Sequence, residues 1–155
     1  MSEGATTGAG APTAPSALAE RLEALGREVG EREAGHASDL AQARSVAESL
    51  HALVAAAVAR FNGAAKASGA PHAELLLGSI RVDDKHLRAL EFDLQRGRSR
   101  AIVTVKSRGD VTLVGPFHRG KTEGPCRTFP AEARSEIEAA LGDFLARFVE
   151  EATAP

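Results

Sequence analysis

The most chemically suggestive stretch of the sequence is GPFHRGKT, residues 115–122, which fits the phosphate-loop pattern G-x-x-x-x-G-K-[ST] at every position. In a phosphate loop a strand enters a glycine-rich turn, and a helix then begins at once, so that its positive end faces the anion. Here the pair Gly124-Pro125 would stop such a helix within its first turn. We interpret the match as a false positive and expect a loop or an irregular edge strand that leads to a final helix.

The same region holds the single cysteine, Cys126, together with His118 and Glu123. A thiol and an imidazole can act as nucleophile and base, and three such donors can bind a metal, but the sequence offers no third group that would orient the pair. The donors also lack the compact ligand pairs that are typical of zinc sites. We therefore predict no catalytic residues, no metal ligands and no cofactor, with Cys126 as a buried thiol and His118 on the surface.

Basic residues are concentrated in the middle of the chain. Residues 81–127 hold 11 Lys and Arg against 6 Asp and Glu, while the rest of the chain holds 8 against 15. Turns also collect arginine for solubility alone, and the chain has no Tyr or Trp on which bases could stack. Binding of nucleic acid or another polyanion through phosphate contacts is thus an alternative function, and its candidate anion-binding residues form an Arg-rich rim. The rim comprises Arg96, Arg98, Arg100, His118, Arg119 and Lys121.

Two long amphipathic helices are expected on either side of this basic middle. Apolar residues recur at helical spacing from Asp39 to Ser68, and again from about Pro130 to Glu151. Gly69 and Pro71 supply a stop for the first helix. The expected core-facing residues are Leu40, Ala43, Ala47, Leu50, Val54, Ala57 and Phe61 in the first helix, and Ile137, Leu141, Phe144 and Phe148 in the second. Few charges fall between Leu50 and Phe61, so we expect most of that section to be buried.

Between the helices the period of the apolar residues changes from 3.6 to 2, which predicts strands. The segment 74–82 is the first strand, with Leu76, Ile80 and Val82 on its core face, and three more strands centre on Phe92, Val103 and Val111. Their short links permit only antiparallel neighbours. The predicted fold is therefore a two-layer α+β domain, a four-stranded antiparallel meander with a long N-terminal-side helix and a C-terminal helix packed on the sheet.

The domain organisation follows from composition. Residues 1–16 are small and polar and are expected to form a disordered tail, residues 17–37 a short amphipathic helix and linker, and residues 38–152 the single α+β domain. No segment resembles a secretory signal or is long enough to cross a bilayer, so we expect no membrane partner. The single cysteine fits a reducing cytoplasm. The abundance of Ala and the preference for Arg over Lys suit a GC-rich bacterial genome.

Two sets of apolar residues are candidate interface residues. Leu18, Leu22, Leu25 and Val29 line one stripe of the short helix, which we expect to be interrupted by Gly26, Gly30 and Gly35. The second set falls out of phase with the expected sheet core and comprises Leu75, Leu77, Ile102 and Val114. These patches favour a non-catalytic protein-binding or self-assembling adaptor module with a protein partner or a second copy. Coverage of the sheet by the chain's own helices is the simpler alternative, and an enzyme of unrecognised type is a further one.

Overall fold

The computed structural model describes residues 14–83, 88–118, 120 and 124–155, and the chain divides into two compact units, Met1–Ala37 and Ser38–Pro155. In the first unit, helix α2 (Ala14–Ala34) runs without a break through Gly26 and Gly30, so the expected interruption at these glycines is wrong. Each glycine costs about 1 kcal/mol relative to alanine, but it removes no backbone hydrogen bond, and the Ala, Leu, Glu and Arg residues around it favour helix. Residues 1–13 of the expected tail lie outside the described residues.

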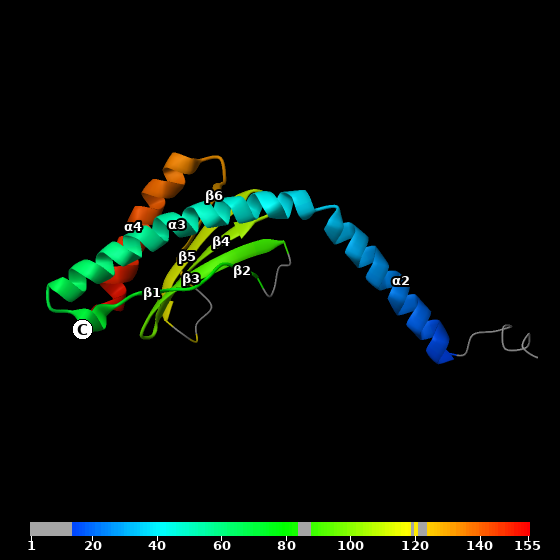
Figure 1. Ribbon diagram of the computed structural model, residues 1–155, viewed down its shortest axis with the longest axis horizontal. Coiled ribbons are helices and arrows are strands. Elements are labelled where there is room, and N and C mark those ends of the chain that lie inside the picture. The colour runs from blue at the N-terminus through cyan, green and yellow to red at the C-terminus, as the bar shows by residue number, and fades with distance from the viewer. Residues whose placement is uncertain (1–13, 84–87, 119, 121–123) are drawn as a thin grey trace, which may run out of the picture. The chain divides into compact units, whose positions relative to one another are not determined.

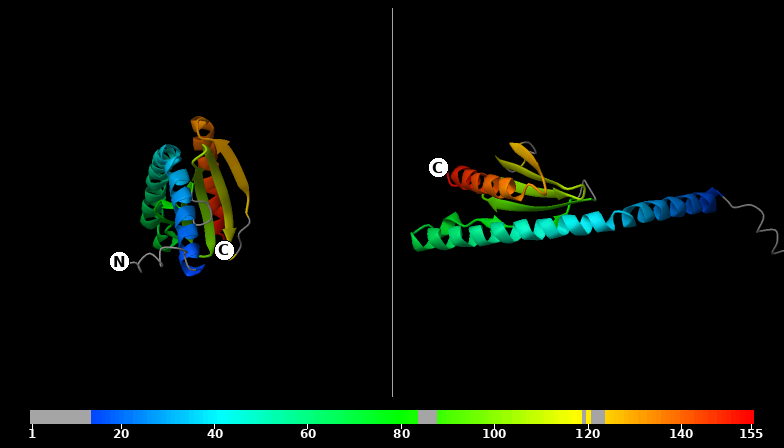
Figure 2. Two further views of the ribbon diagram at one scale, coloured as in Figure 1. Left: turned by 90° about the vertical axis from the view of Figure 1, so that its right-hand side faces the viewer. Right: turned by 90° about the horizontal axis from the view of Figure 1, so that it is seen from above.

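The second unit contains two helices and an antiparallel sheet (Figures 1 and 2). Its elements in chain order are α3 (Ala37–Ala67), the short 3-10 helix η1 (Pro71–Ala73), β1 (Leu76–Leu77), β2 (Arg81–Val82), β3 (Ala89–Arg96), β4 (Ser99–Lys106), β5 (Asp110–His118), β6 (Cys126–Pro130) and α4 (Arg134–Ala152). The strand order is β1-β3-β4-β5-β6, and β2 also pairs with β3. The predicted α+β fold with helices packed on an antiparallel sheet is confirmed.

The strand count differs from the four expected, for two reasons. The first expected strand is divided at Gly78 into β1 and β2, which pair with separate parts of β3. The sequence after β5 returns as the edge strand β6, which was foreseen only as one of two alternatives. Pro130 ends β6 and does not begin the last helix as expected. Proline can lie in β6 because an edge strand tolerates a residue without an N–H group.

The core lies between one face of the sheet and helices α3 and α4. Opposed residues of neighbouring strands share a face, so Phe92 of β3, Val103 of β4 and Leu113 of β5 lie side by side toward the helices. All are buried, together with the expected α4 residues Ile137, Leu141, Phe144 and Phe148. We call this the inner face of the sheet and the opposite side the outer face.

Helix α3 uses a narrower buried stripe than expected. Its buried residues are Ala43, Ala47, Leu50, Val54 and Val58. Ala57 and Leu53 are exposed, so the expectation that most of the section from Leu50 to Phe61 is buried is wrong. A low charge content does not decide burial, because exposed alanines cover a helix surface at little cost.

A polar side chain of α3 holds the segment that leads into β1. The Asn62 side chain donates to the Leu75 carbonyl oxygen at 3.1 Å, and its amide oxygen accepts from the Leu75 N–H at 2.8 Å. This pair of bonds fixes the segment against the helix and turns the Leu75 side chain into the core, where it is only 4% exposed.

Replacing Asn62 by alanine removes both bonds and leaves the backbone groups of Leu75 without these partners. We expect Asn62→Ala to lower the free energy of unfolding by about 1–3 kcal/mol, measured by urea denaturation. Gln42→Ala, at an exposed position of the same helix, is the matched control and should change it by no more than about 0.5 kcal/mol. Equal effects of the two substitutions would contradict the anchoring role of Asn62.

Candidate functional site

The expected Arg-rich rim does not form one cluster. Strand alternation sends Arg96 to the inner side, where its guanidinium donates to the Ala152 carbonyl oxygen at 2.6 Å and to the His72 carbonyl oxygen at 3.4 Å. Ala152 is the last residue of α4, so Arg96 caps the carbonyl end of that helix, where positive charge is favourable. Arg96 is therefore a structural residue, and its expected grouping with Arg98 and Arg100 is wrong.

Arg98 and Arg100 differ from each other as well. Arg98 lies exposed in the two-residue turn between β3 and β4, after Gly97, whose φ of +57° suits the first position of such a hairpin turn. Arg100 lies on the outer face, and its Nε and Nη2 donate to Asp93 Oδ2 at 3.1 and 2.9 Å. Of the three turn arginines, only Arg98 is exposed and has no partner within the described part of the chain.

The remaining rim residues add little to an anion site. His118 ends β5 opposite Ser99 and is exposed, so it lies at the same end of the sheet as the Arg98 turn. Arg119 and Lys121 lie outside the described residues.

The GPFHRGKT stretch is occupied by strand structure up to His118. Gly115 has φ of +112°, and a Cβ there would come within 3.0 Å of the Arg100 carbonyl oxygen, so the position requires glycine for strand packing. Its N–H donates to the Pro125 carbonyl oxygen at 2.7 Å, so this donor is used within the domain. The next element that the structure describes after β5 is the strand β6, whereas a phosphate loop leads into a helix.

Cys126 is exposed, which corrects the expectation of a buried thiol. It pairs with Val114, an outer-face residue of β5, on the edge strand β6, where the helices do not cover it. Among the described residues, no three His, Cys, Asp or Glu side chains are close enough to hold a metal ion. Glu123, the third donor considered above, lies outside them.

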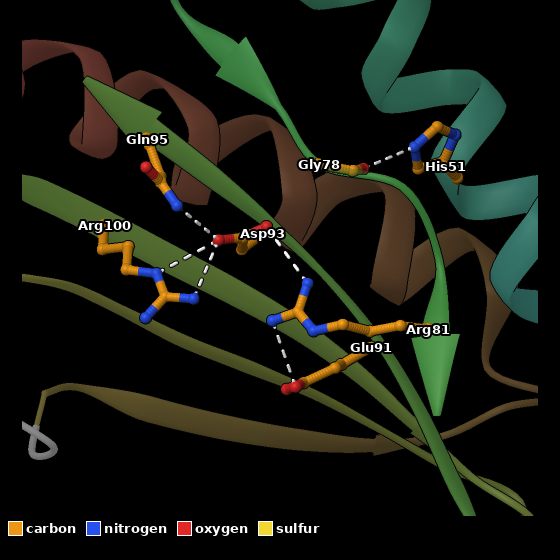
Figure 3. Close-up of polar contacts among 7 residues, drawn as sticks. All are labelled: His51, Gly78, Arg81, Glu91, Asp93, Gln95 and Arg100. Carbon is orange, nitrogen blue, oxygen red and sulfur yellow. Dashed lines mark hydrogen bonds and ion pairs between the residues drawn. The ribbon is translucent and has the colours of Figure 1, made fainter. Parts of the chain in front are cut away.

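The most elaborate polar arrangement lies on the outer face and was not predicted. We call Arg81, Glu91, Asp93, Gln95 and Arg100 the Asp93 network (Figure 3). Asp93 is only 4% exposed, and besides Arg100 it accepts from Gln95 at 3.0 Å and from Arg81 at 3.4 Å. Arg81 also pairs with Glu91 at 3.2 Å. Two guanidinium groups thus face two carboxylates, and the network carries no net charge for a ligand.

A close backbone approach accompanies the network. The Gly78 N–H donates to the Asp93 carbonyl oxygen at 2.8 Å, and a Cβ on Gly78 would overlap the Asp93 carboxylate. On its other side the Gly78 carbonyl oxygen is 2.9 Å from His51 Nε2 (Figure 3). The His51 ring packs edge-on against Phe92. Glycine is therefore required at position 78, between β1 and β2, because the Asp93 carboxylate occupies the space that a Cβ would take.

The two carboxylates of the network respond differently to their surroundings. Burial by itself would raise the pKa of Asp93, but hydrogen bonds from Gln95 and Arg100 and the charges of both arginines outweigh it, so the pKa is lowered. Burial raises the pKa of Glu91, and the charge of Arg81 offsets only part of that effect. A carboxylate held ionised by several donors, as Asp93 is, favours a structural role over proton transfer.

The sheet candidates for an interface separate into two pairs. Leu75 is buried in the core, and Leu77, opposite Leu94, packs against it, so their expected place on the outer face is wrong. Leu76 is the exposed residue of this segment, because the hydrogen bonds from Asn62 to the neighbouring backbone fix which side chains face the core. Ile102 and Val114 do lie opposite each other on the outer face, where both are half-buried.

The apolar stripe of α2 is the largest exposed group of big apolar side chains among the described residues. Leu18, Leu22, Leu25 and Val29 are 59, 57, 45 and 43% exposed. Their spacing of four, three and four places them at alternate a and d positions of a heptad repeat.

A second apolar feature, a groove of about 350 Å³ between α3 and α4, was missed from the sequence. Phe61 and Leu75 line one side, and Leu145 and Val149 the other. Leu145 and Val149 lie next to the core-facing stripe of α4, and this widening of the apolar stripe is the only sign of the groove in the sequence.

Comparison of the chain with protein-family models, curated proteins and solved structures finds no match. Each helix in the described part of the chain is too short or too polar to cross a membrane.

Replacing Asp93 by asparagine tests the network. Because the pKa of Asp93 is lowered by folding, its ionised form stabilises the fold above the pKa of the unfolded chain, and this stability is lost as the pH falls through the lower folded pKa. At pH 7 we expect Asp93→Asn to lower the free energy of unfolding by about 1–3 kcal/mol. The difference from the parent should shrink when urea denaturation is repeated below pH 3.8, the ordinary pKa of an aspartate.

Glu91→Gln is the matched control for this pH dependence. The pKa of Glu91 is raised, so its ionised form opposes folding at neutral pH, and the substitution should cost less than Asp93→Asn. A gap between Asp93→Asn and the parent that stays constant down to pH 3 would rule out the stabilising role of the ionised Asp93.

The three turn arginines are expected to differ in stability when each is replaced by serine. Arg96→Ser and Arg100→Ser remove hydrogen bonds to a helix end and to Asp93, so each should lower the free energy of unfolding by about 1–3 kcal/mol. Arg98→Ser removes only an exposed charge and should stay within about 0.5 kcal/mol of the parent. Thermal unfolding of the three variants checks this order, and a uniform response would favour the original view of a single solvated rim.

Proposed function

We propose that the chain is a cytoplasmic, non-catalytic protein-binding or self-assembling module, and that the apolar stripe of α2 is its contact surface. The observation that carries the proposal is the exposure of Leu18, Leu22, Leu25 and Val29 on one side of a 21-residue helix. A contiguous patch of large apolar side chains in water is a mark of an interaction site.

The energetics of the helix support a partner. An isolated helix of this length is only marginally stable in water, and two internal glycines weaken it further. Packing an apolar stripe against another protein surface supplies the stabilisation that helix propensity does not. Burying four large apolar side chains contributes several kcal/mol, at about 1.5–3 kcal/mol for each one buried completely.

The other parts of the proposal rest on the charge and thiol arrangement. The charged groups that the sheet brings together neutralise one another in the Asp93 network, which supports a structural use over a catalytic one. Arg96 and Arg100 are occupied within the domain, so binding of nucleic acid by the rim is not the function that we favour. An exposed single thiol at Cys126 suits a reducing compartment such as the cytoplasm.

Removal of residues 1–35 tests the contact surface directly. Among the described residues, those that build the core all lie beyond this segment, so the shortened chain should keep its fold. We expect the full chain to have a mass that is a multiple of 16.1 kDa by light scattering, and the shortened chain to be a monomer. The double variant Leu22→Ser/Leu25→Ser should also become monomeric, because serine at both central positions removes most of the apolar contact.

Leu76→Ser serves as the control, because Leu76 is equally exposed but lies on the sheet and not on α2. It should leave the mass unchanged. If the full chain and the shortened chain have the same number of subunits at every concentration tested, the stripe is not a self-association surface and this part of the proposal fails.

A further inference from the structure

The residues beside the apolar stripe of α2 carry information about how two copies would pair. With Leu22 and Val29 at a positions and Leu18 and Leu25 at d positions, the flanking g positions hold Arg21 and Glu28. The flanking e positions are Ala19, Gly26 and Glu33. In a two-helix coiled coil, side chains at e and g meet those of the partner helix, and so they decide its direction.

A parallel pair would bring like charges together. The g residue of one helix then faces the e residue five positions later in the other, which sets Glu28 against Glu33 of the second copy, twice by symmetry. Arg21 would face only Gly26. The next d position after Val29 is Arg32, and in a parallel pair the two copies of Arg32 would meet at the seam. The contact of Glu28 with Glu33 and the contact between the two copies of Arg32 each bring like charges together, and this weakens a parallel pair.

An antiparallel pair removes these conflicts. Leu18 then packs on Val29 of the second copy, and Leu22 on Leu25. In this register g residues face g residues, so Arg21 lies beside Glu28 of the second copy, again twice by symmetry. Arg32 falls opposite residue 15, at the far end of the partner helix, where its side chain reaches water.

Two features of α2 itself agree with this register. The register is centred between residues 23 and 24, so it overlaps almost the whole of Ala14–Ala34. The e positions that would meet are Ala19 and Gly26, whose small side chains permit close approach of the helices. Arg21 and Glu28 have no ion-pair partner within the described residues, whereas Arg27, on the side away from the stripe, is paired with Glu23 at 2.9 Å.

From this charge pattern we propose that α2 binds α2 of a second copy of the chain in antiparallel orientation, with Arg21 paired to Glu28 across the interface. This proposal rests on the self-association proposed above and adds the partner, the direction and the register. Its charge pairs select orientation, while the apolar stripe provides most of the affinity.

Charge reversal on the full chain distinguishes the two directions. In the antiparallel pair, Glu28→Arg sets the new arginine against Arg21, and Arg21→Glu sets the new glutamate against Glu28. Each single variant should raise the dimer dissociation constant about tenfold at low salt, because two symmetric attractions become repulsions. The double variant Arg21→Glu/Glu28→Arg should return it to the parent value. Sedimentation over a concentration series measures these constants.

The parallel pair predicts the opposite sign for one of these variants. There Glu28→Arg would face Glu33 and tighten the dimer. Arg27→Glu is the matched control for a charge change on this helix, and it should leave the dissociation constant within about twofold of the parent because position 27 points away from the seam. Tighter binding by Glu28→Arg, or no rescue in the double variant, overturns the antiparallel proposal while self-association through the stripe stands.

A distance measurement decides the direction independently of charge. In a Cys126→Ser background, Ala17→Cys carries a spin label on the outward side of α2. The antiparallel register places residue 17 opposite residue 30, so the two labels lie about 20 Å apart along the axis, at 1.5 Å per residue. A parallel pair would hold the two labels at the same level along the axis, so their separation would lack this axial offset and be shorter. The shorter distance, or a monomer at every concentration, overturns the proposal.

Discussion

The outer half of this domain depends on one buried carboxylate. Asp93 lies at the centre of β3 with 4% of its surface exposed, and an ionised group so placed requires opposite charges and hydrogen bonds around it. Those donors come from three separate segments, namely Arg81 on β2, Gln95 further along β3, and Arg100 on β4. The Asp93 carboxylate also leaves no room for a side chain at Gly78, the residue that follows β1.

The same constraint explains why a basic sequence does not make a basic site. The number of arginines in a segment does not say on which face of the sheet each one lies. The alternation of side chains along a strand decides that direction. Arg96 and Arg100 are near neighbours in sequence, yet one caps the end of α4 on the inner side and the other balances Asp93 on the outer side. What remains available at that end of the sheet, among the described residues, is Arg98 in the turn and the exposed His118.

Helix α2 follows a different principle from the α+β domain. Residues 38–155 bury their apolar residues against one another, while the apolar stripe of α2 stays exposed in its own unit. Such a helix gains from a partner, and the charged residues on its two flanks restrict which partner and which direction give a favourable pairing. The proposed pairing thus assigns affinity to the four apolar residues and selectivity to Arg21 and Glu28.

The sequence by itself determined the periodic features of this protein. The helical spacing around Leu50 and Phe144, the two-residue alternation around Phe92 and Val103, and the short turns between strands were sufficient for the α+β fold and its antiparallel sheet, because each reports on a local backbone repeat. The conflict between Gly124-Pro125 and the helix of a phosphate loop can likewise be seen from neighbouring residues alone.

Only the tertiary structure decided the relations between segments that lie far apart in the chain. Leu75 is in the core because Asn62, on another element, hydrogen-bonds its backbone, and β6 is a strand because β5 offers it an edge. The groove between α3 and α4 and the partners of Asp93 likewise join residues from different elements. No local period encodes such contacts, because each depends on the spacing and direction of two elements after they have packed.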